Sequence, residues 1–314
     1  MGAAHSCGPA PMDPAPGSAL GARYFRSATS GLLLHHRSWH PAGAPRAAVY
    51  LLHGYAEHID RFCGFAAALA AAGFVVHGMD LVGHGGSEGD RAYLHDFKDI
   101  TADVLQLITA VHPQPTLPRF LMGHSMGGLL ALRTAQVAPA GTLTGLILSG
   151  PALLIAPEVD NALNRLLART LSGVWPKLPV QPVDARMLCS DPAVCAQFKR
   201  DPLCYQGAIR VRTGAEVIKA IDAARAAAPA MGAGLALLVV HGADDALCRV
   251  EGSRQLLALA TGVPDRALIE YAGLLHEITS EREGGARVAA DVIAWLAARA
   301  GAAAAAGAPP PAAG

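Results

Sequence analysis

At 314 residues the chain is long enough for two small domains, or for one α/β domain with an insertion, and either would bury a sizeable core. Basic and acidic residues number 25 each, so the formal charge is zero and no basic surface for nucleic acid is indicated. The six cysteines form no C-x-x-C pair and no zinc spacing, which indicates reduced thiols and a cytoplasmic location.

Both ends of the chain have a biased composition. Residues 1–21 are rich in Pro, Gly and Ala, and residues 301–314 consist almost wholly of Ala, Gly and Pro. Such segments have too little apolar surface to offset the entropy lost on ordering. We therefore predict a disordered N-terminal segment and a flexible C-terminal tail.

The chain begins with a motif for lipid attachment. Its first six residues fit M-G-x-x-x-[ST], the eukaryotic pattern for N-myristoylation of Gly2, and Cys7 could accept a second acyl chain. Two acyl chains hold a protein stably on a membrane, whereas one binds reversibly. No apolar stretch is long enough to span a bilayer and no basic residue precedes Arg23, so the sequence predicts neither a transmembrane helix nor a secretory signal.

Between the ends, apolar strand-like runs alternate with helix-like segments. This alternation is typical of a mostly parallel sheet with helices on both faces. We place eight strands, near Tyr24, Leu33, Val49, Val75, Leu121, Leu146, Val239 and Ile269. The alternation breaks at residues 151–233, where we expect an insertion that covers the site as a cap. The core is then formed by residues 22–150 and 234–300.

A glycine-rich loop, D-L-V-G-H-G-G-S-E-G, covers residues 80–89. A phosphate-binding loop would need a lysine and a serine directly after the glycines, or a helix that opens on G-x-G-x-x-G, and neither pattern is present. The glycines are better explained by a tight turn that packs beneath the loop at residues 53–58. We therefore interpret this segment as structural.

Residues 123–128, G-H-S-M-G-G, lie between a predicted strand and a helix-like stretch. They match the G-x-S-x-G elbow, in which a serine on a sharp strand-to-helix turn is exposed as a nucleophile. The positions two residues before and after Ser125 must lack bulk, and Gly123 and Gly127 meet that need. A plain glycine-rich turn is the alternative, but the flanking strand and helix favour a nucleophilic Ser125.

A serine nucleophile needs a base, and the base needs an acid that orients it. On this kind of elbow the order along the chain is Ser, then Asp or Glu, then His. Only His241 and His276 follow Ser125, and His241 lies inside a strand before the acid candidates. We therefore predict His276 as the base. Asp244 and Asp245 both follow that strand, and spacing alone does not choose between them.

The attacked carbonyl also needs N–H donors for the oxyanion that forms on it. In this kind of fold one donor is the amide after the serine, here Met126, and the other lies in the loop after the third strand. That loop reads H-G-Y-A-E-H at residues 53–58, and the expected second donor is the Tyr55 N–H. The other residues of the loop are expected to shape it or to begin the next helix, without a catalytic role.

Five segments together resemble the monoacylglycerol lipase and lysophospholipase family of α/β-hydrolases. They are residues 53–58, 80–89 and 123–128, with G-A-D-D at 242–245 and Y-A-G-L-L-H at 271–276. The resemblance spans roughly residues 23–298 and implies that the acid is Asp245, at the end of the G-x-x-D motif, and that the base is His276. The first oxyanion position is often a small residue in animal members, and here it is Tyr55. Because the donor is a backbone amide, the resemblance implies that the oxyanion hole is retained.

The insertion contains apolar residues at helical spacing. They form one stripe: Val159, Leu163, Leu166, Leu167, Thr170, Leu171, Val174 and Trp175. Such a stripe often packs onto its own domain. The resemblance favours a second interpretation, in which part of the stripe faces an acyl tunnel or a lipid surface.

The resemblance implies an α/β-hydrolase fold with a mostly parallel eight-stranded sheet and a helical cap inserted between two central strands. It implies a serine hydrolase that cleaves monoacylglycerol to fatty acid and glycerol through an acyl-enzyme, without a metal or organic cofactor. A lysophospholipase or a general carboxylesterase is an alternative. A non-catalytic binding protein is an alternative of another class. The expected partner is a small lipid ester, with peripheral membrane contact through the cap, and no nucleic acid.

Overall fold

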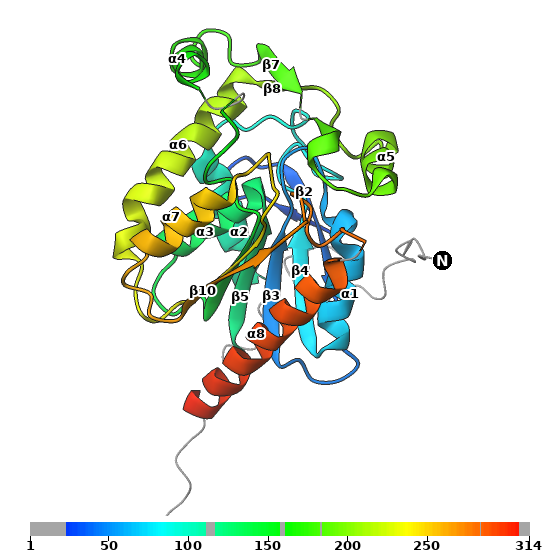
Figure 1. Cartoon of the computed structure of the whole chain (residues 1–314), viewed down its shortest axis with the longest axis vertical. Helices are drawn as coiled ribbons and strands as arrows, with labels where there is room; N and C mark the ends of the chain where they lie inside the picture. The colour runs from blue at the N-terminus through cyan, green and yellow to red at the C-terminus, as the bar shows by residue number, and fades with distance from the viewer. Residues whose placement is uncertain (1–22, 111–116, 158–160, 183, 283, 308–314) are drawn as a thin grey trace, which may run out of the picture.

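The computed structural model describes residues 23–110, 117–157, 161–182, 184–282 and 284–307 (Figure 1). Its centre is an eight-stranded sheet of order β1-β2-β4-β3-β5-β6-β9-β10. β2 pairs antiparallel with both β1 and β4, and the other pairs are parallel. The strands are Tyr24–Arg26 (β1), Leu33–Trp39 (β2), Ala47–Leu52 (β3), Phe74–Met79 (β4), Arg119–His124 (β5), Gly145–Ser149 (β6), Ala236–Gly242 (β9) and Arg266–Tyr271 (β10). The eight predicted strands and the mostly parallel α/β fold are confirmed.

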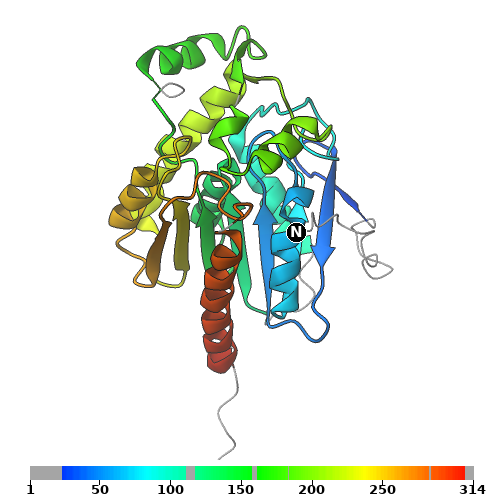
Figure 2. The ribbon, with the colours of Figure 1, turned by 45° about the vertical axis from the view of Figure 1, so that its right-hand side comes forward.

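The central strands are apolar along their whole length because helices cover both faces of the sheet. Successive side chains alternate between the two faces, so Tyr50 and Leu52 pack in one core and Val49 and Leu51 in the other. The first core contains α2 (Phe97–Ala110), α3 (Met126–Val137), α6 (Val211–Ala227) and α7 (Val250–Leu259). The second contains α1 (Cys63–Ala71) and α8 (Gly285–Gly307), which lie on the same face of the sheet (Figure 2).

The chain between β6 and β9 forms the elements that cover one end of the sheet. They are α4 (Ala162–Leu171), β7 (Pro179–Pro182), η2 (Ala185–Met187), α5 (Pro192–Arg200) and β8 (Ala208–Arg210), followed by α6 and η3 (Ala228–Ala230). β7 and β8 pair as a separate two-stranded sheet at the top of Figure 1. α6 differs from the rest because it runs down beside the sheet and packs against α3 as well as α4.

The parallel strands bring distant loops to one edge of the sheet. β3, β5, β9 and β10 end at Leu52, His124, Gly242 and Tyr271, and their carboxyl ends point the same way. The loops that follow them carry Tyr55, Ser125, Asp245 and His276. Ligands of open α/β sheets bind at this edge, so the topology gathers all the predicted catalytic groups there.

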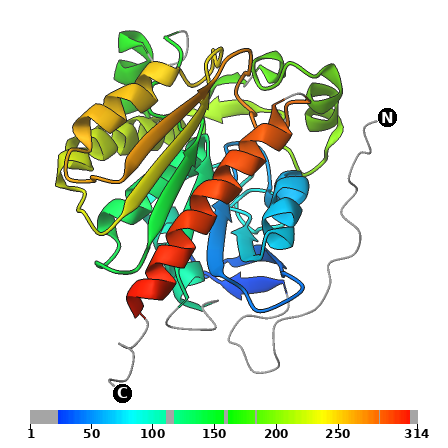
Figure 3. The same cartoon turned by 60° about the horizontal axis from the view of Figure 1, so that its bottom comes forward.

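The C-terminal boundary differs from the expectation. We expected a flexible tail from residue 301, but α8 continues to Gly307 (Figure 3). Alanine is the strongest helix former, so an alanine-rich segment can extend an established helix without burying much surface. Residues 308–314, the expected N-terminal segment with Gly2 and Cys7, and Val159 of the stripe lie outside the described residues. Within the part that is described, every helix is too short or too polar to cross a membrane.

Candidate active site

Ser125 lies on a strained turn between β5 and α3. Its backbone has φ 55° and ψ −120°, a region that residues with a side chain rarely adopt, at a cost of roughly 1–3 kcal/mol. A Cβ on Gly123 would lie 2.0 Å from the Gly127 carbonyl oxygen, and a Cβ on Gly127 would lie 2.3 Å from that of His53. The elbow therefore needs glycine at both positions, as the sequence predicts.

His276 and Asp245 meet at the same edge of the sheet. The Nδ1 atom of His276 lies 2.7 Å from Oδ2 of Asp245, and both side chains are buried. A carboxylate only accepts hydrogen bonds, so Nδ1 carries the proton and Nε2 is left with a lone pair. Asp244, in contrast, is exposed and accepts a hydrogen bond from the Gly273 N–H, 2.9 Å away. The structure thus brings Asp245, and not Asp244, to His276.

The loop after β9 holds Asp245 as an anion. Its Oδ1 accepts the N–H groups of Leu247 and Cys248, each at 2.9 Å. Burial raises the pKa of this carboxyl, but the charge of His276 and the hydrogen bonds from His241, His276 and the Cys248 N–H lower it more, to well below its usual value. Asp245 is therefore ionised throughout the neutral range and is aligned by its own backbone before it meets the imidazole.

The environment of His276 favours its protonated form relative to a free imidazole. Burial lowers the pKa of His276, but the Asp245 carboxylate outweighs this effect and leaves the pKa above its usual value. The ring of His124 lies 4.7 Å from that of His276, centroid to centroid. Burial and the charge of His276 lower the pKa of His124 to about 4, so this second ring is neutral. Sequence reasoning assigned no role to His124.

The loop at residues 53–58 is fixed by its own polar side chains. His53 is fully buried; its Nε2 accepts the Leu81 N–H at 3.0 Å, so its Nδ1 donates to the Gly54 carbonyl at 2.7 Å. The Gly54 N–H donates to Oε1 of Glu57 at 2.7 Å. These bonds hold the backbone at Tyr55 beside Ser125, since a Cβ on Gly54 would lie 3.1 Å from the Ser125 Cβ.

A buried ion cluster lies behind this loop and was not foreseen from the sequence. Arg61 donates to Glu57 at 3.0 Å and to both oxygens of Glu277 at 2.8 and 2.6 Å. Burial raises the pKa of Glu277 to about 6, against the opposing effect of Arg61. The only sequence signal was local: Glu57 and Arg61 have the i, i+4 spacing of a helical ion pair. Glu277 is 216 residues from Arg61 and directly follows His276.

The glycine-rich loop at residues 80–89 packs beneath the loop at 53–58, as expected. Asp80 accepts hydrogen bonds from the Ile59 N–H at 2.7 Å and from the Gly86 N–H at 2.8 Å, and it pairs with His35 at 2.9 Å. A Cβ on Gly85 would lie 2.2 Å from Asp80. These contacts explain the glycines by close packing.

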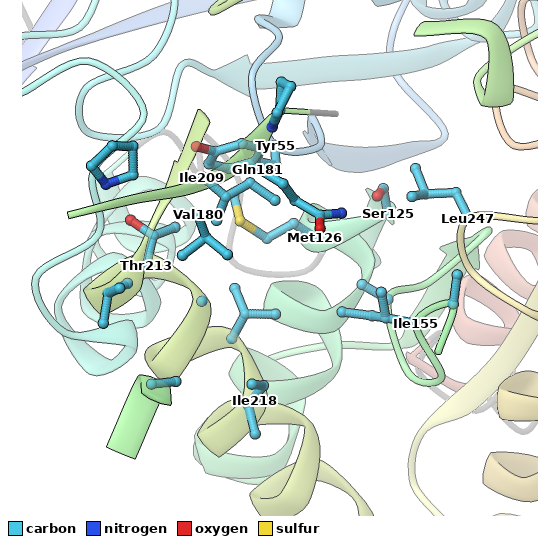
Figure 4. A pocket seen from close by; sticks show the side chains of 18 of the residues that line it. Tyr55, Ser125, Met126, Ile155, Val180, Gln181, Ile209, Thr213, Ile218 and Leu247 are labelled. Atoms are coloured by element: carbon cyan, nitrogen blue, oxygen red, sulfur yellow. The ribbon is translucent and has the colours of Figure 1, made fainter. Parts of the chain in front are cut away.

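A cavity of about 470 Å³ opens beside Ser125 (Figure 4). Its wall includes Tyr55 and Met126 as well as Ser125. Most of the other lining side chains are apolar and come from the insertion, α6 and the loop after β9, among them Ile155, Ala168, Leu171, Leu178, Val180, Met187, Ile209, Val211, Val217, Ile218 and Leu247. The volume and the apolar lining suit a hydrocarbon group.

The apolar stripe of the insertion has two kinds of surroundings. Leu171 lines the cavity, whereas Leu166, Val174 and Trp175 are exposed to 58%, 69% and 61%. The side chains of Leu163 and Leu167 lie outside the described set. The stripe is therefore partly in the cavity wall and partly exposed on the surface of the insertion.

One group of side chains in the described chain has the donor atoms of a metal site. His58, Asp201 and Cys204 place one nitrogen, oxygen and sulfur atom each within 4.8 Å of one another. However, burial raises the pKa of the Cys204 thiol to about 12, and the nearby Arg61 cation would repel a metal ion. His58 and Asp201 already pair at 2.9 Å. We interpret the group as a contact that fastens the insertion to the loop at 53–58.

The chain is similar to known proteins along most of its length. The family model described as serine aminopeptidase, S33, matches residues 43–283. The monoacylglycerol lipase of Mycolicibacterium smegmatis is 36% identical over 269 residues, which cover 85% of this chain and 93% of that protein. The human monoglyceride lipase is 34% identical over 252 residues, which cover 80% of this chain and 82% of that protein.

A solved structure gives the same result. The monoacylglycerol lipase of Paleococcus ferrophilus superposes with a TM-score of 0.77 at 28% identity, covering 85% of this chain and 99% of that one. The match to the family model runs from β3 to β10 and so includes the insertion between β6 and β9. The chain therefore belongs to the serine aminopeptidase S33 family of α/β-hydrolases, together with the monoacylglycerol lipases, and is a serine hydrolase of carboxylic esters.

Proposed function

We propose that this enzyme hydrolyses monoacylglycerol to a fatty acid and glycerol, with Ser125, His276 and Asp245 as its catalytic triad. The observation that carries the proposal is the apolar cavity of about 470 Å³ that begins at Ser125, because it can take an acyl chain and leave the ester carbonyl at the serine. The names of the related lipases support the same substrate.

The proposed reaction begins with attack of the Ser125 Oγ on the ester carbonyl carbon while His276 Nε2 takes the hydroxyl proton. The N–H groups of Tyr55 and Met126 hold the oxyanion of the tetrahedral intermediate. Collapse of this intermediate breaks the ester bond, and His276 returns the proton to the departing glycerol. A water molecule, deprotonated by His276, then releases the fatty acid from Ser125. Asp245 orients His276 and stabilises its imidazolium throughout.

The charges around His276 favour a neutral head group over a phosphate. The carboxylates of Glu57, Asp245 and Glu277 all act on His276, against the single guanidinium of Arg61. A net negative charge about 10 Å from a phosphate costs roughly 1–2 kcal/mol at an effective dielectric constant of about 20. Glycerol meets no such penalty. Monoacylglycerol is therefore favoured over a lysophospholipid whose head group is a bare phosphate.

The experiment compares esters that share one acyl chain. We expect kcat/KM for 1-oleoylglycerol to exceed that for 1-oleoyl lysophosphatidic acid by about tenfold or more, as the electrostatic penalty implies. A short nitrophenyl ester serves as the control for the triad alone. Preference for the lysophospholipid would assign the enzyme to the alternative function. Equal rates on all three esters would indicate a general carboxylesterase.

We also propose that the cap contacts lipid surfaces peripherally. The exposed apolar side chains of Leu166, Val174 and Trp175 lie on and directly after α4, the helix whose Leu171 lines the cavity. The test is sedimentation with phosphatidylcholine vesicles containing monoacylglycerol. Val174→Ser should lower the bound fraction, whereas Val137→Ser, which changes an exposed valine at the end of α3, should not. Equal binding by both variants would contradict the proposal.

Cytoplasmic location is a further part of the proposal. Four cysteines, Cys189, Cys195, Cys204 and Cys248, are free thiols in the structure, whereas Cys63 takes part in a disulfide bond, so the prediction of reduced thiols is wrong for Cys63. The proposal therefore rests on the cysteine spacing, which has no C-x-x-C pair. Fractionation of cells that produce the tagged protein tests this assignment. Recovery in a secreted fraction would contradict it.

A further inference from the structure

His241 is a second buried histidine that touches the proposed catalytic acid. It is the penultimate residue of β9 and has no exposed surface. Its Nδ1 lies 2.7 Å from the Ser253 Oγ and its Nε2 lies 2.7 Å from the Cys248 carbonyl oxygen. The same Nε2 lies 3.2 Å from Oδ2 of Asp245. Sequence reasoning excluded His241 as the base and gave it no other role.

The partners of His241 determine where its proton lies. A carbonyl oxygen only accepts hydrogen bonds, so the Nε2 that faces Cys248 must carry a hydrogen. The Ser253 hydroxyl can then donate to the lone pair on Nδ1. The tautomer with its proton on Nε2 thus satisfies both partners and directs one N–H between the Cys248 carbonyl and Asp245.

Two imidazoles consequently share one oxygen of Asp245. Oδ2 faces His276 Nδ1 at 2.7 Å and His241 Nε2 at 3.2 Å, while Oδ1 accepts two backbone N–H groups. His241 also fastens the carbonyl of Cys248, the residue whose N–H binds Oδ1. The carboxylate is therefore held from three directions besides that of His276.

We propose that His241 is a positioning residue for the triad, whose Nε2–H fixes Oδ2 of Asp245 toward His276 and limits how strongly this carboxylate holds the His276 proton. The inference rests on the proposed triad. A donor on Oδ2 withdraws electron density from the oxygen, so the imidazolium of His276 is stabilised less than it would be by an otherwise free carboxylate. Because its imidazolium is stabilised less, His276 returns the proton more readily to the leaving alcohol.

One other charged group near this network titrates close to the acid limb: burial raises the pKa of Glu277 to about 6, in the native enzyme and in the variants of His241 alike. His276 faces Glu57 and Glu277, whose negative charges favour its protonated form, and the neutral ring of His124. On the neighbouring strand β10, Glu270 lies opposite His241 and is paired with Arg254 at 2.5 Å. Substitution of His241 changes none of these groups. A shift in the pKa of His276 would therefore show that the contact between His241 and Asp245 had been lost.

The test is the pH dependence of kcat/KM in two variants of His241. His241→Leu removes the donor, and we expect kcat/KM to fall about tenfold and the acid limb of the profile to move up by about half a pH unit, the size expected for one weak bond to a charged group. His241→Gln retains an N–H donor, and we expect its acid limb to return toward that of the native enzyme. His77→Leu, at a buried histidine of β4, is the control for the loss of stability.

The inference would be overturned if the acid limb of His241→Leu stayed in place while its rate and melting temperature fell together, as in His77→Leu. A measurement on the unmodified enzyme covers the case in which His241→Leu does not fold. Nitrogen NMR should show His241 with its proton on Nε2, and the opposite tautomer would also overturn the inference. If Ser125→Ala or His276→Ala kept full activity, the proposed function itself would fail. This outcome distinguishes failure of the proposed triad from failure of the inference about His241.

Discussion

Gly127 packs directly against His53, so the nucleophile elbow and the loop at residues 53–58 are in contact through their backbones. A Cβ at position 127 would lie 2.3 Å from the His53 carbonyl oxygen and 2.7 Å from that of Leu52. No side-chain movement can relieve this clash because both atoms belong to the backbone of β3 and its following loop. The spacing between Ser125 and the Tyr55 N–H therefore depends on the absence of one methyl group.

Gly127→Ala should lower both activity and stability. The methyl group must push the two loops apart, and overpacking of this kind costs roughly 1–3 kcal/mol or more. We expect kcat to fall by at least about a hundredfold, because oxyanion donors act over short distances. Gly234→Ala is the matched control, since a Cβ there meets no atom within 4 Å. Normal activity in Gly127→Ala would show that the elbow tolerates a wider separation.

Ser125→Ala should abolish ester hydrolysis and leave the fold intact. The serine side chain lies at the cavity wall, and the hydrogen bond that it makes with the Cys248 thiol is a weak one, so the melting temperature should change little. Loss of a triad nucleophile commonly lowers the rate by several orders of magnitude. A fluorophosphonate should label Ser125 in the native enzyme. Retention of about a tenth of the native activity would assign the nucleophile elsewhere.

The adjacent aspartates should respond differently to the same substitution. Asp245→Asn removes the charge that orients His276, and we expect kcat to fall about a thousandfold or more. Asp244→Asn loses only an exposed hydrogen bond to the Gly273 N–H, so its rate should stay within a few-fold of native. Each variant controls for the other because the two positions share one loop. The reverse ranking would transfer the acid role to Asp244.

Activity should fall as the pH decreases through the pKa of His276. The base must be neutral to accept the Ser125 proton, and the Asp245 carboxylate raises the pKa of His276 above its usual value of 6.5. The acid limb of kcat/KM should therefore lie above pH 6.5. In Asp245→Asn the charge that raises this pKa is absent, so the residual activity should persist to lower pH. An acid limb at the same pH in both proteins would contradict this coupling.

Leu171→Glu should discriminate against long acyl chains. Leu171 lines the cavity beside the serine, and a carboxylate there would have to lose water when a hydrocarbon chain enters. We expect the ratio of kcat/KM for a long-chain monoacylglycerol to that for a short nitrophenyl ester to fall about tenfold or more. Thermal unfolding provides the check on stability. A lower melting temperature with an unchanged ratio would mean that Leu171 only packs.

The local sequence determined the sheet and the turn that carries the proposed nucleophile. The eight strands were recognisable because buried parallel strands are continuous apolar runs between turn residues. Ser125 was recognisable because its strained turn needs glycines at fixed positions on either side. His276 followed from the order of groups along the chain, since few histidines come after Ser125. Each of these predictions depends on a pattern within about ten neighbouring residues or on simple order.

The tertiary structure decided what spacing could not. Asp244 and Asp245 are equivalent in the sequence, and only the turn that directs two N–H groups to Asp245 distinguishes them. The ion cluster of Glu57, Arg61 and Glu277 joins the loop after β3 to the loop after β10. His241 contacts Asp245 because β9 ends beside the acid loop. These interactions depend on how strands pair across the sheet, and no local pattern encodes such pairing.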